Sequence, residues 1–136
     1  MEYGNQETFH LQILEKRLGG KHMILCDTNI IIEVLKKNQA VIHTIEKIGL
    51  DKIAISAVTA MELYYGALNK IELKKIKRHL SAIRIFHIEE DISITATGLI
   101  EKYAKSHGLQ IPDALIAGTA LNYDIKLYTH NKKDFI

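Results

Sequence analysis

The sequence predicts an α/β protein in which a parallel sheet of four or five short strands lies between two layers of helices. Short apolar runs that suit buried strands alternate with longer segments whose apolar residues recur at helical spacing. Strands that are apolar throughout are typical of parallel sheets, and the alternation places helices on both faces. In such sheets, ligands bind beyond the carboxyl ends of the strands.

The first part of the chain is expected to form two strands and two helices. Residues 23–26 are a short apolar run that predicts a buried strand, and the polar residues 27–29 end it. Helical patterning resumes from residue 30 to about 37, and a second helix covers 40–48. Residues 53–55 predict the next buried strand.

Two helices with one apolar face each are expected next. In the first, four residues at helical spacing form one apolar stripe: Val58, Met61, Tyr65 and Leu68. In the second, the inner face leaves the lysines outside and carries Leu73, Ile76, Leu80 and Ile83.

The remaining elements are two strands and two helices. Residues 85–88 predict a third strand, and a long helix that includes Tyr103 stops near Gly108. Pro112 opens the next helix, because its fixed φ suits a first helical turn. Residues 125–128 predict the final strand.

One domain accounts for most of the chain. The 136 residues are 47% hydrophobic and 25% charged, the balance of a soluble globular protein. No apolar run approaches the roughly 20 residues of a membrane span, and the N-terminus lacks a signal-peptide pattern. Because Cys26 is the only cysteine, no internal disulfide is possible, and we expect a cytoplasmic protein. The domain is expected over 23–136, with residues 1–22 an N-terminal extension or a cloning-derived segment.

Three acidic residues lie where strands end or helices begin, and each has a structural alternative. Asp27 follows the first strand, where its carboxylate would enter the ligand crevice or cap the next helix. Glu62 completes the pattern Thr59-x-x-Glu62, a capping box that favours a structural role when the residue is taken alone. Asp113 follows Pro112 in a first helical turn, where the helix dipole favours a carboxylate.

Taken together, Asp27, Glu62 and Asp113 predict one metal-binding pocket at an edge of the sheet. Clustered carboxylates repel one another, and a divalent cation would compensate that repulsion. Mg²⁺ prefers anionic oxygen ligands, and a bound cation can activate water and neutralise charge on a phosphoryl group. The seven histidines show no paired ligand spacing, and Cys26 lies in a buried strand, so a zinc site is not expected.

A basic segment could guide nucleic acid to this pocket. Six basic residues stand between positions 70 and 84 against the single acid Glu72: Lys70, Lys74, Lys75, Lys77, Arg78 and Arg84. The net charge of +2 is too small to indicate nucleic-acid binding by itself, but such a face could track phosphates. RNA contacts are assigned to Lys70, Lys74, Lys77 and Arg78, and a solvated Lys-rich helix surface is the alternative.

Four motifs in order carry a resemblance to a known family: ILCDTN at 24–29, ELYYG at 62–66, IPDALIAGTA at 111–120 and LYTHNKKDF at 127–135. With them the sequence resembles PIN-domain ribonucleases, and among these the VapC toxins of bacterial and archaeal toxin–antitoxin pairs. The third and fourth motifs, at these separations, are the most specific. The resemblance covers nearly the whole chain, from Met23 to Phe135.

The resemblance implies a three-layer α/β/α sandwich with an acidic pocket that binds Mg²⁺ or Mn²⁺. Asp27, Glu62 and Asp113 match the family's metal-binding acids. Members often have a fourth acid where this chain has Asn131, which could orient a metal-bound water, and Asp134 could reach in from the next turn. We therefore expect weak metal affinity until RNA phosphate supplies further oxygen ligands.

Thr28 and Thr129 resemble hydroxyl groups that support the metal ligands, and simple helix capping is the alternative. The implied function is a Mg²⁺-dependent endoribonuclease, the toxin of a type II toxin–antitoxin system, that hydrolyses RNA by a metal-activated water. The implied partners are a second copy of the chain in a homodimer and an antitoxin whose segment lies across the acidic pocket. The alternatives are a housekeeping RNA-processing PIN nuclease and a non-catalytic RNA-binding PIN module.

Overall fold

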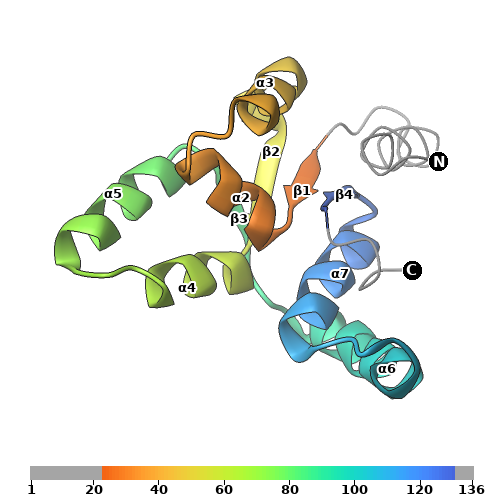
Figure 1. Ribbon diagram of the computed structural model, residues 1–136. Coiled ribbons are helices and arrows are strands. Elements are labelled where there is room, and N and C mark those ends of the chain that lie inside the picture. Colours follow the sequence, from red (N-terminus) through yellow and green to blue (C-terminus); the bar gives the residue numbers. More distant parts are fainter. Residues whose placement is uncertain (1–22, 131–136) are drawn as a thin grey trace.

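Residues 23–130 are the part of the chain that this computed structural model describes. They contain a four-stranded sheet with the order β3-β2-β1-β4, in which every pair of neighbours is parallel. The strands are β1 (Ile24–Cys26), β2 (Ile53–Ser56), β3 (Arg84–Phe86) and β4 (Lys126–Tyr128). The predicted parallel sheet is confirmed (Figure 1). The interpretation of residues 1–22 lies outside the described part.

Six α-helices connect the strands within this part of the chain. They are α2 (Thr28–Leu35), α3 (Gln39–Ile48), α4 (Ala57–Tyr65), α5 (Lys70–Leu80), α6 (Glu90–His107) and α7 (Ile111–Tyr123), with a 3₁₀ turn at Leu50–Lys52. Helix α2 begins at Thr28, two residues before the predicted start, because Asp27 already caps it. Strand β3 ends at Phe86, whereas the prediction carried it to residue 88.

Both faces of the sheet are buried, as the apolar strands predict. Along β1, Ile24 and Cys26 join one core cluster and Leu25 joins the other, as expected for side chains that alternate between faces. The first cluster includes residues of α2, α3, α4 and α5, and the second includes Ile116 and Ala120 of α7. The three-layer arrangement is therefore confirmed.

Helices α6 and α7 pack closely against each other on one side of the sheet (Figure 1). A Cβ atom added at Gly118 of α7 would lie 3.2 Å from the carbonyl oxygen of Ile92 in α6. Gly108 ends α6 with a φ of 68°, a left-handed conformation that glycine adopts without strain, so the predicted helix stop is confirmed. Within residues 23–130, no helix is both long and apolar enough to cross a membrane.

The apolar stripe predicted for the helix now assigned as α4 is wrong. Met61 is 56% exposed and Tyr65 is 94% exposed, and Leu68 lies beyond the helix end. The buried residues of α4 are instead Val58, Thr59, Ala60 and Leu63. Two of these, Thr59 and Ala60, are small or polar, so a search for large apolar side chains selects Met61 and Tyr65 instead. The same bias placed Leu73 of α5 inside, although its side chain is 36% exposed.

Candidate metal site and adjoining groove

The site begins where β1 and β4 end side by side. The chain runs from β1 outward to β2 and β3 and returns to β4 on the other side of β1. This reversal places a crevice beyond the carboxyl ends of β1 and β4, the usual ligand position in such sheets. Asp27 follows β1 and Thr129 follows β4, and Thr129 Oγ1 donates a hydrogen bond of 2.8 Å to Asp27 Oδ2.

Asp27 is held at its other oxygen as well. Its backbone is extended and its Oδ1 accepts a hydrogen bond of 2.7 Å from the backbone N–H of Thr28, so it caps α2. The capping interpretation is therefore confirmed, and it does not exclude a role in the crevice. With only 3% of its surface exposed, Asp27 is a buried carboxylate whose two oxygens are both fixed by hydrogen bonds.

Glu62 reaches the same corner from α4. Thr28 Oγ1 donates to Glu62 Oε1 at 2.6 Å, so the backbone of Thr28 bonds one acid and its hydroxyl bonds the other. Thr59 Oγ1, one turn before Glu62, lies 2.9 Å from Thr28 Oγ1. The structure therefore connects Asp27 and Glu62 through Thr28.

The capping box predicted for Thr59 and Glu62 is wrong. Ser56 caps α4, with its hydroxyl accepting a hydrogen bond of 3.0 Å from the Val58 N–H. Thr59 is consequently the third residue inside the helix and is fully buried. Glu62 is exposed and has no capping contact, which removes the structural alternative that weighed most against its role in the site.

Asp113 lies in the first turn of α7, as predicted, and is half-buried. Helix α7 returns the chain to the start of β4, so its first turn lies toward the edge at which the strands end (Figure 1). Within residues 23–130, however, no three His, Cys, Asp or Glu side chains are grouped closely enough to hold a metal ion. Hydrogen bonds through Thr28 join Asp27 with Glu62. Asn131 and Asp134 lie outside the described residues.

Comparison with known proteins identifies the fold. A family model described as the PIN domain matches residues 24–136. The chain belongs to the PIN-domain family. It is 33% identical over 127 residues to toxin FitB of Neisseria gonorrhoeae, covering 83% of this chain and 91% of that protein.

Two further matches support this assignment. The tRNA(fMet)-specific endonuclease VapC of Shigella flexneri is 31% identical over 119 residues, covering 82% of this chain and 88% of that protein. Among solved structures, a toxin–antitoxin complex from Klebsiella pneumoniae has a TM-score of 0.72 and 31% identity, covering 82% of this chain and 89% of that chain. The resemblance seen in the four sequence motifs is confirmed.

The donor atoms of this PIN domain fit a hard divalent cation. The side chains at the corner present only oxygen atoms: the carboxylates of Asp27 and Glu62 and the hydroxyls of Thr28 and Thr129. Mg²⁺ is commonly held by one or two carboxylates together with waters and substrate phosphates, so a pair of acids is sufficient to begin such a site. Within the described residues, the side chain of Glu62 makes no hydrogen bond or ion pair other than that with Thr28.

Cys26 is adjacent to Asp27 but takes no part in the site. Burial of the thiol raises the pKa of Cys26 well above its ordinary value, and the negative charge of Asp27 raises it further. The thiolate is the form that binds metals and attacks electrophiles, so a thiol that stays protonated does neither.

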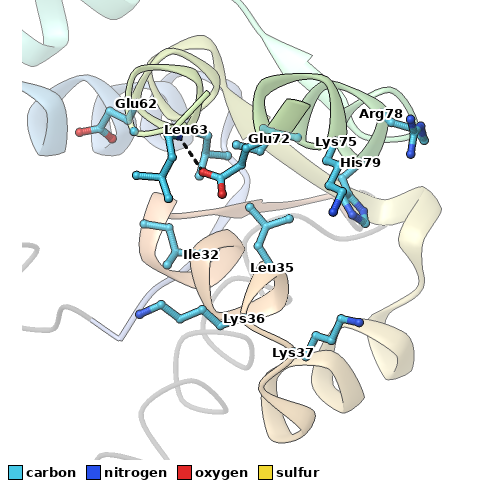
Figure 2. Close-up of a pocket in the computed structure, with 13 residues that line it drawn as sticks. Ile32, Leu35, Lys36, Lys37, Glu62, Leu63, Glu72, Lys75, Arg78 and His79 are labelled. Carbon is cyan, nitrogen blue, oxygen red and sulfur yellow. Dashed lines mark hydrogen bonds between the residues drawn. The ribbon is translucent and has the colours of Figure 1, made fainter. Parts of the chain in front are cut away.

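A groove of about 750 Å³ runs between α2, α4 and α5 and reaches Glu62. Its apolar lining includes Ile32, Leu35, Leu63, Leu68 and Ile76. Its polar lining includes the basic residues Lys36, Lys37, Lys75 and Arg78, together with His79 and the acids Glu62 and Glu72. Figure 2 shows Glu62 at one end and Arg78 at the other, with Lys36 and Lys37 beyond the end of α2 pointing to opposite sides.

Only one of the four basic residues predicted to contact RNA lines the groove. Arg78 lines it, together with Lys75, which the assignment of RNA contacts left out. Lys70, Lys74 and Lys77 are exposed on α5 but do not line the groove. Lys36 and Lys37 come from a different part of the sequence, and only the folded chain brings them opposite α5 (Figure 2).

Proposed function

We propose that this protein is a Mg²⁺- or Mn²⁺-dependent endoribonuclease and the toxin of a type II toxin–antitoxin pair. The observation that carries the proposal is the joining of Asp27 and Glu62 through Thr28 at the switch point of a PIN fold. The names of its relatives, a toxin and a tRNA endonuclease, support the substrate class and the biological role.

Each residue at the site has a distinct part in the proposed reaction. Asp27 and Asp113 hold the principal cation, and Glu62 completes the site or assists a second cation. When bound, the cation supplies an activated water and neutralises charge on the phosphoryl group. Thr129 and Thr28 fix the two carboxylates in place by hydrogen bonds. No side chain need act as a nucleophile.

RNA reaches the site along the basic groove. Lys75 and Arg78 of α5 line the same groove as Lys36 and Lys37, and phosphates bound along it lead toward Glu62. Lys70, Lys74 and Lys77 add to the positive field of α5 from outside the groove. We therefore assign the specific contacts with RNA to the residues that line the groove. The outer face of α5, formed by Lys70, Lys74 and Lys77, supplies the long-range attraction.

The partners of the protein follow from the same assignment. A solved relative is a toxin–antitoxin complex, which supports a cognate antitoxin whose segment lies across the acidic site and blocks RNA. We further propose a homodimer and a cytoplasmic setting, which the single buried cysteine suits. RNA and antitoxin should then compete for the protein.

The test is cleavage of total RNA by wild type and by Asp113→Asn, with Mg²⁺ or with EDTA. Wild type should cleave only with Mg²⁺, and Asp113→Asn should be inactive with an unchanged circular dichroism spectrum. Asp51→Asn, which removes an exposed acid in the 3₁₀ turn before β2 and so at the opposite ends of the strands from the site, is the control and should cleave normally. Unchanged Mg²⁺-dependent cleavage by Asp113→Asn would refute the assignment of the site.

A further inference from the structure

Thr59 contacts the site only through the hydroxyl of Thr28. Its side chain is fully buried on α4, and its Oγ1 lies 2.9 Å from Thr28 Oγ1 across 31 residues of sequence. Within the described residues, this is the only hydrogen bond of the Thr59 side chain. A buried hydroxyl without a partner costs free energy, whereas valine has the same shape without that cost. The hydrogen bond to Thr28 therefore offsets the cost of burying the Thr59 hydroxyl.

The direction of the hydrogen bond follows from counting hydrogens. Thr28 Oγ1 carries one hydrogen and has two oxygen neighbours, Glu62 Oε1 at 2.6 Å and Thr59 Oγ1 at 2.9 Å. A carboxylate only accepts, so the hydrogen of Thr28 goes to Glu62. Thr59 must then be the donor to Thr28. The three side chains form a one-way chain that begins at Thr59 and ends at the carboxylate.

Other helical threonines of this protein use their hydroxyl differently. Thr44, Thr97 and Thr119 each donate to the backbone carbonyl four residues earlier, at 2.8 to 3.1 Å. Such local bonds are the ordinary use of a threonine inside a helix. Thr59 instead directs its hydrogen out of its own helix and toward the residue that holds both acids.

We propose that Thr59 is a positioning residue of the metal site, which acts on Glu62 through Thr28. This role rests on the proposed function. The donated hydrogen fixes the rotamer of Thr28 and polarises its O–H, which strengthens the bond to Glu62. Glu62 is exposed, so no surrounding packing would otherwise hold its carboxylate in one direction. Groups that orient metal ligands in this manner change metal affinity about 10- to 100-fold when they are removed.

The experiment compares Thr59→Val and Thr59→Ser with wild type. Mn²⁺ affinity is measured by calorimetry without RNA, cleavage is measured with Mg²⁺, and stability is measured by urea unfolding. Thr59→Val should bind Mn²⁺ about tenfold more weakly, and Thr59→Ser, which keeps the donor, should restore affinity. The matched control is Thr119→Val, because Thr119 is also fully buried in a helix but bonds only the Leu115 carbonyl. It should lose stability and keep wild-type Mn²⁺ affinity.

Three results would overturn the role of Thr59. One is wild-type Mn²⁺ affinity and cleavage in Thr59→Val. A second is an equal loss in Thr59→Val and Thr59→Ser, because packing rather than the hydroxyl would then be responsible. A third is an equal loss of affinity in Thr119→Val, which would indicate general destabilisation. A wild-type protein that neither binds Mn²⁺ nor cleaves RNA would instead overturn the proposed function, and the positioning role with it.

Discussion

Thr28 Oγ1 donates a hydrogen bond of 2.6 Å to Glu62 Oε1, although the two residues are 34 positions apart in the sequence. The bond connects the start of α2, directly after β1, with the middle of α4, which follows β2. Because the backbone N–H of Thr28 also bonds Asp27, the carboxylates of two chain segments share one anchor. The two acids are thus linked through a single residue.

Glu62→Gln removes the negative charge of this side chain and keeps an oxygen that can accept the hydrogen bond from Thr28. The amide oxygen can still accept from Thr28, so the free energy of unfolding should change little or rise as charge repulsion near Asp27 is relieved. RNA cleavage should fall by at least the roughly 10- to 100-fold that loss of a ligand-orienting group costs, because the site loses an anionic ligand itself. Urea unfolding and a fluorogenic RNA assay measure the two effects. A stable variant with wild-type cleavage would show that Glu62 is not a ligand.

Loss of the Thr129 hydroxyl should destabilise the protein. Thr129 Oγ1 donates to the buried carboxylate of Asp27, and hydrogen bonds to charged groups contribute about 1.5 to 3 kcal/mol. Thr129→Val should lower the free energy of unfolding by about 2 kcal/mol, measured by urea unfolding. Thr129→Ser keeps the donor and loses one methyl group, at a cost of about 1 kcal/mol. Equal losses in the two variants would mean that packing, not the hydrogen bond, is responsible.

Most of the fold could be predicted because its signals are local. The apolar strands are short and uninterrupted, and Gly108 and Pro112 mark a helix end and a helix start by their own backbone preferences. The face of α4 could not be predicted, because its packing depends on the small residues Thr59 and Ala60 meeting the rest of the core. Size and hydrophobicity favoured Met61 and Tyr65, which the fold leaves exposed.

The sequence indicates the acids of the candidate site but not the hydrogen bonds that connect them. Asp27 could be placed because it follows a strand directly. Thr59 and Glu62 satisfy the capping-box pattern by spacing alone, and that pattern favours a cap at Thr59. The signal that could have corrected this is Ser56, a good capping residue placed directly after the apolar run 53–55. The pairing of Thr59 with Thr28 joins separate chain segments, and no spacing in one sequence encodes it.

The burial of Cys26 should make stability depend on alkaline pH. Burial, and then the charge of Asp27, raise the pKa of Cys26 above its ordinary value of 9.0, so the folded thiol keeps its proton where the unfolded one loses it. This contribution is fully present below pH 9 and is lost as the pH rises above it, at about 1.4 kcal/mol per pH unit. Between pH 9 and 10, wild type should therefore lose more stability than Cys26→Ala. Parallel losses in urea unfolding would contradict this.

Substitution by alanine should have opposite effects on stability at Gly118 and at Gly98. A Cβ at Gly118 would lie 3.2 Å from the Ile92 carbonyl oxygen, which belongs to helix backbone and cannot move aside cheaply. Overpacking of this kind costs about 1 to 3 kcal/mol, which should exceed the gain of about 1 kcal/mol in helix propensity. Gly118→Ala should therefore lower the melting temperature. Gly98→Ala in α6, where nothing lies within 4 Å, should raise it. A Gly118→Ala protein more stable than wild type would show that the helices can separate.

The groove and the outer face of α5 can be compared with two variants of equal charge. Lys75→Gln/Arg78→Gln removes two positive charges that line the groove, and Lys70→Gln/Lys74→Gln removes two that do not. Long-range attraction of RNA should fall to a similar degree in both. Direct phosphate contacts should be lost only in the groove variant, so only this variant should have a higher KM for RNA. The slope of its log affinity against log salt should also be smaller, by about 1.4. Fluorescence anisotropy at several salt concentrations measures the slope. Equal slopes for the two variants would place RNA on the helix as a whole, and a larger change in the Lys70/Lys74 variant would place it on the outer face.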